Sequence, residues 1–128
     1  MILNLHKYIR KQSNYHIMNP DHRETRNFLN RVRSAIKRLN YEILDSREKY
    51  RKTIAELGIL DEDVLDDICQ LTEFDNWSKD RDDNSKFSGD VWKCIKRLHN
   101  SDIYVKLKIK VDENGKLLIM SYHFDNML

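Results

Sequence analysis

Side chains that can move protons and hold a phosphate gather in the last third of the sequence. Tyr104, Lys106 and Lys108 alternate with apolar residues, and His123 follows on the next apolar stretch. An imidazole changes charge near neutral pH, so His123 is a candidate general acid or base. Tyr104 is a candidate to position a phosphate, stack on a base or share in proton transfer, and lysines offset the charge that develops on a phosphate. This set suits proton transfer at a phosphate. The other interpretation is a solvated strand surface whose lysines discourage edge pairing.

The pattern around these residues predicts a β-hairpin with one buried face. Apolar side chains occupy every second position of residues 103–111, which is the alternation of a half-buried strand, and residues 116–124 form the returning strand. Asn114-Gly115 between the two strands is a strong hairpin signal, because both residues tolerate a positive φ.

A two-residue loop at Asn114-Gly115 would fix the pairing of this hairpin. Lys106 would lie directly opposite His123, where its like charge disfavours a protonated imidazole. The returning strand would contribute Leu118, Met120, Tyr122 and Phe124 to the apolar face. The opposite face would carry Tyr104, Lys106, Lys108, Lys110, Ser121 and His123.

A third strand is predicted just before this hairpin. Residues 90–98 alternate, and a turn at Asn100-Ser101 would pair Lys93 with Lys108 and bring Lys93 to the polar face. The preceding residues 73–88 read as a long loop, which is a common place for functional residues, and Lys79 and Arg81 are its cations. Trp77 is expected to anchor this loop to the body of the protein.

The first half of the chain predicts helices. Apolar spacing indicates helices over residues 22–39, from a cap at Asp45-Ser46 to Gly58, and from a cap at Asp61, with residues 40–44 as an edge strand. The fold class is therefore α+β, with the helices packed on an antiparallel sheet. Residues 1–20 are expected to be an extension, and residues 21–128 a single domain.

Composition bounds the class of protein. The 128 residues are 40% hydrophobic and 34% charged, which is enough for one soluble domain with a modest core. No apolar run is long enough to cross a membrane, and the first residues lack the features of a secretory signal. Cys69 and Cys94 stand alone, so we expect reduced thiols and a cytoplasmic protein. Charge runs basic, acidic, basic along the chain, which suits either a polyanion and a basic partner or pairing within the molecule.

An ordered set of short segments resembles one known family. The segments are Glu56-Leu57-Gly58-Ile59 with Asp61, Ile68 through Leu71-Thr72-Glu73, the stretch from Asp75 to Lys79, Asp90-Val91-Trp92, and residues 103–109 and 118–123. Over roughly residues 23–124 this order is similar to that of toxins of the MqsR (motility quorum-sensing regulator) family. The resemblance implies a RelE-like fold and a type II toxin that cleaves messenger RNA without metal or cofactor. It also implies a cognate antitoxin, expected to be a helix-turn-helix DNA-binding protein, as partner.

The resemblance assigns catalytic positions residue by residue, namely Lys79, Lys93, Tyr104 and His123. Some family members have glutamine at the position of Lys93 and lysine at that of His123. Arg81, Lys106 and Lys108 are expected to contact RNA. Two other functions stay open. One is a non-catalytic adaptor of the same fold that binds RNA or a protein. The other is a protein-interaction module built on the acidic residues 61–90.

Overall fold

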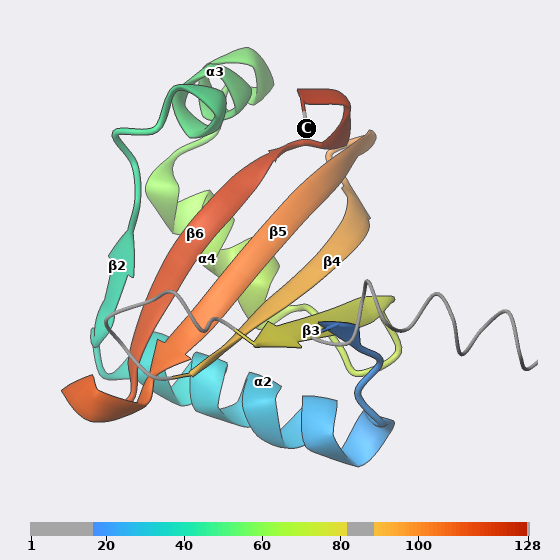
Figure 1. The fold of residues 1–128 in the computed structure, drawn as a ribbon. Coiled ribbons are helices and arrows are strands. Elements are labelled where there is room, and N and C mark those ends of the chain that lie inside the picture. Colours follow the sequence, from blue (N-terminus) through green and yellow to red (C-terminus); the bar gives the residue numbers. More distant parts are fainter. Residues whose placement is uncertain (1–16, 82–88, 128) are drawn as a thin grey trace, which may run out of the picture.

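The computed structural model describes residues 17–81 and 89–127, and within them it forms an α+β domain of three helices and six strands (Figure 1). The helices are α2 (His22–Lys37), α3 (Glu48–Leu57) and α4 (Asp61–Cys69). The strands are β1 (Ile17–Met18), β2 (Tyr41–Ile43), β3 (Trp77–Arg81), β4 (Asp90–Leu98), β5 (Ser101–Lys110) and β6 (Lys116–Phe124). The expectation for residues 1–16 lies outside the described residues, whereas Ile17–Met18, assigned to the same extension, pairs with β3.

Helix α2 begins where the sequence predicts. The carboxylate of Asp21 accepts a hydrogen bond from the backbone N–H of Glu24 at 2.7 Å, which satisfies one free donor of the first turn. The helix is tied to the C-terminus of α4 by Arg33. Its Nε donates to the carbonyl of Cys69 at 2.9 Å and its Nη2 to that of Leu71 at 2.7 Å. An arginine that could have met a ligand is therefore part of the scaffold.

The starts of the other two helices differ from the prediction. Helix α3 begins at Glu48 after Arg47, whose side chain makes no capping bond, so the predicted cap at Asp45-Ser46 is wrong. Its end is confirmed, because Gly58 closes it at φ 69°. Helix α4 includes Asp61 as its first residue rather than as its cap.

The predicted three-stranded meander forms the centre of a larger sheet. The strand order is β1-β3-β4-β5-β6-β2, in which β2 runs parallel to β6 and the other pairs are antiparallel. The short edge strand at β2 is confirmed. The long loop predicted over residues 73–88 is wrong in its first part, where β3 adds to the sheet, while residues 82–88 lie outside the described residues.

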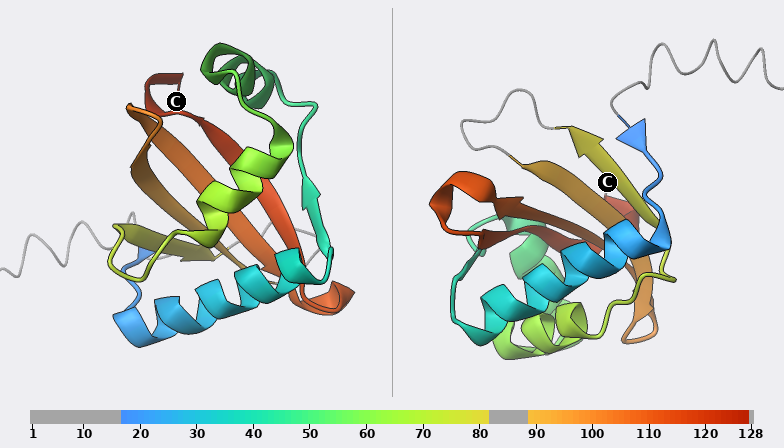
Figure 2. Two further views of the ribbon diagram at one scale, coloured as in Figure 1. Left: turned by 180° about the vertical axis from the view of Figure 1, so that it is seen from behind. Right: turned by 90° about the horizontal axis from the view of Figure 1, so that it is seen from below.

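The core lies between the sheet and helices α2 and α4, on one side of the sheet (Figure 2). We call this side the helix face. Phe28 of α2 stacks on Trp92 of β4 with ring centroids 4.1 Å apart, and Trp77 is buried as expected. Ile103, Val105 and Leu107 have no exposed surface, which confirms the predicted apolar face of β5. Fully burying such side chains stabilises a fold by about 1.5–3 kcal/mol each.

The turn between β4 and β5 lies one residue earlier than predicted. His99 and Asn100 form it, with φ of 52° and 63°, and Leu98 pairs with Ser101. Lys93 consequently pairs with Lys106 rather than with Lys108. The register differs from the prediction by two residues, and because strand side chains alternate with period 2, every residue of β4 keeps its predicted face.

The hairpin of β5 and β6 contains a β-bulge that the sequence did not predict. Leu107 pairs with Ile119 and Lys106 with Ser121, so Met120 has no partner. The extra residue reverses the alternation. Ile119 and Leu117 are buried with the apolar face of β5, and the predicted placement of Leu118 and Met120 on that face is wrong.

The loop of this hairpin is also longer than two residues. Lys110 pairs with Lys116, and a short 3₁₀ turn at Val111–Glu113 precedes Asn114-Gly115. Both turn residues have the predicted positive φ, 57° and 73°.

No helix in the described part of the chain combines the length and apolar character that crossing a bilayer requires.

Candidate functional site

The sheet face turned away from α2 and α4 carries the polar residues that the sequence singled out. We call it the outer face, and it is the near side of the sheet in Figure 1. One row across four strands consists of Ser78, Lys93, Lys106 and Ser121, which are successive cross-strand partners. The neighbouring row contains Tyr104 and His123. Two residues along a strand advance about 6.6–6.8 Å, so the lysines of one row are within reach of a group held by the other.

Tyr104 and His123 are direct partners between β5 and β6. Their ring centroids lie 5.3 Å apart at an angle of 37°. The predicted partner of His123 was Lys106. The loop of the hairpin is three residues longer than predicted, and the one-residue bulge offsets part of this, so the pairs beyond the bulge are shifted by two residues. Burial, and then the negative charge of Asp125, raise the pKa of Tyr104. The phenol therefore keeps its proton at neutral pH and can act as a hydrogen-bond or proton donor.

The ring of His123 is held in one orientation. Its Nδ1 lies 2.9 Å from the backbone carbonyl of Phe124, an atom that can only accept, so Nδ1 must carry the hydrogen of that bond. A neutral imidazole donating from Nδ1 has its acceptor lone pair on Nε2. The side chain is 5% exposed and lines a cavity of about 420 Å³ at the edge of the sheet. The arrangement therefore makes Nε2 the nitrogen available to take a proton.

The lysines of the outer face differ in accessibility. Lys93 is 27% exposed, and its Nζ lies 3.8 Å from a carboxylate oxygen of Asp80. Lys106, beside it, is half-buried. Lys108 lies on the predicted face, but it is 1% exposed, so the expected contact with RNA does not fit this conformation.

Lys79 does not belong to this group. Lys79 is the cross-strand partner of Trp92, and the ring of Trp92 packs on α2. Because cross-strand partners lie on the same face of a sheet, the side chain of Lys79 points to the helix face. Its ammonium forms an ion pair with Glu24 of α2, and it lies 5.5 Å from the centre of the Trp92 ring. The structure thus contradicts a catalytic set in which Lys79 converges with Tyr104 and His123. Ser78, one residue earlier, is the residue of β3 that shares the outer face with Lys93.

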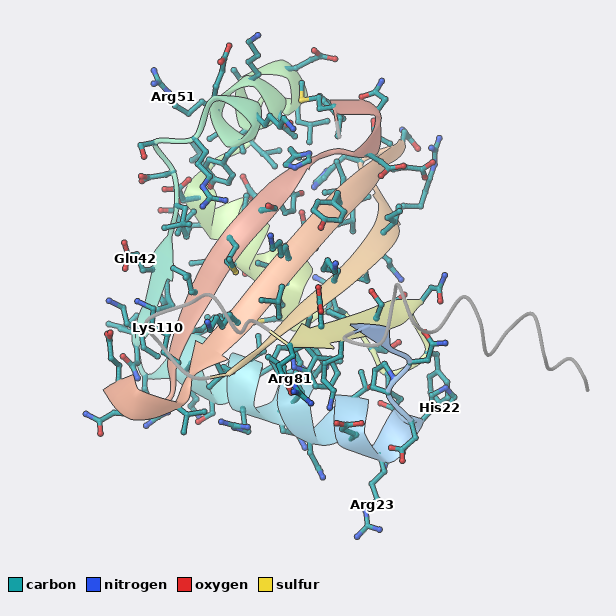
Figure 3. The ribbon with its side chains drawn as sticks, viewed as in Figure 1. His22, Arg23, Glu42, Arg51, Arg81 and Lys110 are labelled. Carbon is teal, nitrogen blue, oxygen red and sulfur yellow. The ribbon has the colours of Figure 1, made fainter. Side chains whose placement is uncertain are left out.

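Arg81 is likewise on the other side. It follows Lys79 by two residues on β3, which gives it the same face, and it is exposed beside α2 at the end of the sheet (Figure 3). The predicted contact of Arg81 with the same RNA site is therefore not supported by its placement.

Two cavities border the row of Tyr104 and His123. One, of about 360 Å³, lies over β3 and β4 next to Tyr104 and Lys93. The other lies between the first turn of α3 and the bulge of β6, next to His123. Arg47 and Lys49, which line this second cavity, were not predicted as site residues. The sequence at the start of a helix does not indicate which strand the helix will pack beside.

Comparison with known proteins identifies no relative, since no family model, no curated protein and no solved structure matches this chain. Within residues 17–81 and 89–127, no three His, Cys, Asp or Glu side chains are grouped so that they could hold a metal ion.

Proposed function

We propose that this protein is an endoribonuclease that cleaves RNA through the ribose 2′-hydroxyl and needs no metal ion. The observation that carries the proposal is the direct pairing of Tyr104 with His123 on the outer face, with Lys93 and Lys106 in the next row. These are a base, an acid and two cations on rigid strands, which is a combination suited to phosphoryl transfer by proton movement and charge stabilisation.

In the proposed reaction, Nε2 of His123 takes the proton of the 2′-hydroxyl. The freed oxygen attacks the adjacent phosphorus, the bond from phosphorus to the 5′-oxygen breaks, and the phenol of Tyr104 donates a proton to that leaving oxygen. The products are a 2′,3′-cyclic phosphate and a 5′-hydroxyl end. Lys93 and Lys106 offset the negative charge that grows on the phosphate oxygens in the transition state. The assignment of base and acid follows from the Nδ1 bond of His123 and the raised pKa of Tyr104.

The resemblance to MqsR-type toxins extends the proposal to a biological role. The protein would be the toxin of a type II toxin-antitoxin system with a RelE-like fold, acting on messenger RNA in the cytoplasm. Its partner would be an antitoxin with a helix-turn-helix DNA-binding part, encoded in the neighbouring reading frame. Inhibition of the purified nuclease by the product of that reading frame tests this step separately from the chemistry.

The cleavage test compares matched histidine variants. Purified protein is incubated with total RNA in the presence of a chelator, as wild type, His123→Ala, Tyr104→Phe and His22→Ala. His22 is exposed at the start of α2, far along the chain from the proposed site (Figure 3). Wild type and His22→Ala should degrade RNA at equal rates, and the other two variants should leave it intact. RNA left intact by the wild type, or cut equally by His123→Ala, would refute the proposal.

A binding protein without nuclease activity is the second candidate. It is favoured by the position of Lys79, which leaves the outer face one ammonium group short of the set that the resemblance implies. Binding of single-stranded RNA with a strong dependence on salt, together with intact RNA in the test above, would support this candidate.

A further inference from the structure

A row of outer-face side chains leads from the proposed reaction site to the cavity over β3 and β4. The row consists of His123, Tyr104 and Ile95, which are successive cross-strand partners on β6, β5 and β4. The cavity has a volume of about 360 Å³, which is in the range of small-ligand sites. The outer-face and rim residues that line it are Asn19, Asn76, Ser78, Lys93, Ile95 and Tyr104.

The floor of this cavity is apolar because β3 stops short of it. Strand β3 begins at Trp77, the partner of Cys94, so Ile95 has no partner on β3. Ile95 is 48% exposed, and the half-buried ring of Tyr104 lies beside it on β5. An aromatic ring with an apolar neighbour is the kind of surface on which the flat face of a nucleobase packs in single-stranded RNA.

Asn76 stands at the rim of the cavity in a fixed position. Its neighbour Asp75 forms an ion pair with Lys96 of β4, with 2.7 Å between the charged atoms. On the other side, the indole N–H of Trp77 donates to the carbonyl of Thr72 at 2.9 Å. These two contacts hold the turn before β3 against the sheet, and they hold the side chain of Asn76 at the cavity.

Asn19 supplies a second amide from the segment that follows β1. Met18 pairs with Lys79 of β3, and continuing this register brings Asn19 beside Ser78 on the outer face. Both asparagines are exposed, and no hydrogen bond within residues 17–81 and 89–127 uses the side-chain amide of either one. An amide carries a donor and an acceptor side by side, which is the arrangement that pairs with the edge of a base.

The order of the proposed base and acid sets the direction of the RNA across the sheet. His123 on β6 takes the proton of the attacking 2′-hydroxyl, so the nucleotide on the 5′ side of the cut lies toward β6. Tyr104 on β5 gives a proton to the leaving 5′-oxygen, so the nucleotide on the 3′ side lies toward β4 and the cavity. Neighbouring strands are about 4.8 Å apart, so the cavity lies directly beside the reacting phosphate.

Building on the endoribonuclease function proposed above, we propose that the cavity over β3 and β4 binds the base of the nucleotide on the 3′ side of the cut. The base packs on Ile95 and Tyr104, and the amides of Asn19 and Asn76 form hydrogen bonds with its edge. Lys93, which also lines the cavity, contacts the phosphate on the 5′-oxygen of this nucleotide. Contacts with a base edge discriminate among the four bases, whereas contacts with phosphate do not, so this cavity gives the enzyme its sequence preference.

The test uses single nucleotides, so that it does not depend on cleavage. A nucleoside 5′-monophosphate carries its phosphate as the nucleotide on the 3′ side of the cut does, and a 3′-monophosphate carries it as the nucleotide on the 5′ side does. All four bases are titrated in both forms, and NMR follows the side-chain amides of Asn19 and Asn76 and the methyl groups of Ile95. The proteins are wild type, Asn76→Ala and Asn30→Ala. Asn30 is the matched control, because it is exposed on α2, which covers the helix face.

We expect at least one 5′-monophosphate to shift these signals and to bind more tightly than its 3′ isomer. Asn76→Ala should raise the Kd of that nucleotide by about fivefold or more, the discrimination that a paired amide gives, and Asn30→Ala should leave it unchanged. The signals of Asn19 and Ile95 report binding in the Asn76→Ala variant. Unshifted signals with every 5′-monophosphate, equal binding of the 3′ isomer, or an unchanged Kd in Asn76→Ala would each overturn the inference.

The same proteins separate this inference from the nuclease proposal. Binding of a 5′-monophosphate that depends on Asn76, in a protein that leaves RNA intact, would support the base site and refute the nuclease. Cleavage of RNA by a protein whose cavity binds no 5′-monophosphate would support the nuclease and refute the base site. If both proposals hold, cleavage should select the base on the 3′ side of the cut, and Asn76→Ala should weaken that selection.

Discussion

Replacing one lysine on each face of the sheet separates catalysis from stability. Lys93→Met should slow RNA cleavage strongly and leave the free energy of unfolding nearly unchanged. Lys79→Met should do the reverse, although the resemblance to a toxin family marks both positions as catalytic. The difference follows from the register, because Lys93 is a partner of Lys106 on the outer face and Lys79 is a partner of Trp92 on the helix face.

The expected sizes follow from what each ammonium contacts. Loss of one group that stabilises a transition-state charge costs about 2.7–4 kcal/mol of barrier, a factor of about 10²–10³ in rate. The side chain of Lys93 is 27% exposed, and its ammonium also lies near the carboxylate of Asp80. We therefore expect Lys93→Met to slow cleavage by about 100-fold, the lower end of this range. Lys79 is 13% exposed and paired with Glu24, which is itself 42% exposed. Its loss should destabilise the fold by about 1–2 kcal/mol, near the lower end for a charged hydrogen bond plus a cation–π contact.

The assay combines urea unfolding with the rate of RNA cleavage at a temperature where both variants are folded. Urea midpoints report the stability difference directly when the slope is unchanged. Loss of cleavage in Lys79→Met at wild-type stability would refute the assignment of the two faces. A Lys93→Met variant as active as wild type would refute the role given to the outer row.

Three further changes test other parts of the structure. Tyr122→Phe removes a buried hydroxyl that donates to Asp67 at 2.6 Å, and should lower the free energy of unfolding by about 1.5–3 kcal/mol in urea titrations; no change would contradict that bond. Gly89→Ala should destabilise by more than about 1 kcal/mol, because φ is 129° and a β-carbon would collide with the carbonyl of Ile109; wild-type thermal unfolding would argue against this backbone path. The raised pKa of Tyr104 keeps the acid protonated to higher pH, so the alkaline fall of kcat/KM should be centred above the usual tyrosine value of about 10, and a fall below it would exclude Tyr104 as the acid.

Alternation along the strands predicted the outer face better than it predicted the pairing. Both hairpin registers were wrong, but an error of two residues leaves a side chain on its face, so Lys93, Tyr104 and His123 still come together. An odd error reverses the face, and this happened to Leu118 on the loop side of the bulge, where the register differs from the prediction by three residues. No glycine or proline marks the bulge at Met120, and its carbonyl bond to Arg47 depends on a helix distant in sequence.

Strand β3 was missed for a different reason. Its helix-face positions after Trp77 are Lys79 and Arg81, so it lacks the apolar alternation that indicates a half-buried strand. Lys79 is tolerated there because Glu24 of α2 neutralises it, which only the packing of the helix on the sheet reveals. The position that the resemblance assigns to Lys79 is one residue from Ser78, which is the residue of β3 that pairs with Lys93 on the outer face.

The chemical nature of the RNA ends tests the central claim most directly. If a 2′-hydroxyl attacks with His123 as base and Tyr104 as acid, wild-type protein in the presence of a chelator must leave 2′,3′-cyclic phosphate and 5′-hydroxyl ends. The double variant carrying His123→Ala and Tyr104→Phe must leave none. Intact RNA with the wild type, ends bearing a 5′-phosphate and a 3′-hydroxyl, or the same cyclic ends from the double variant would contradict the account.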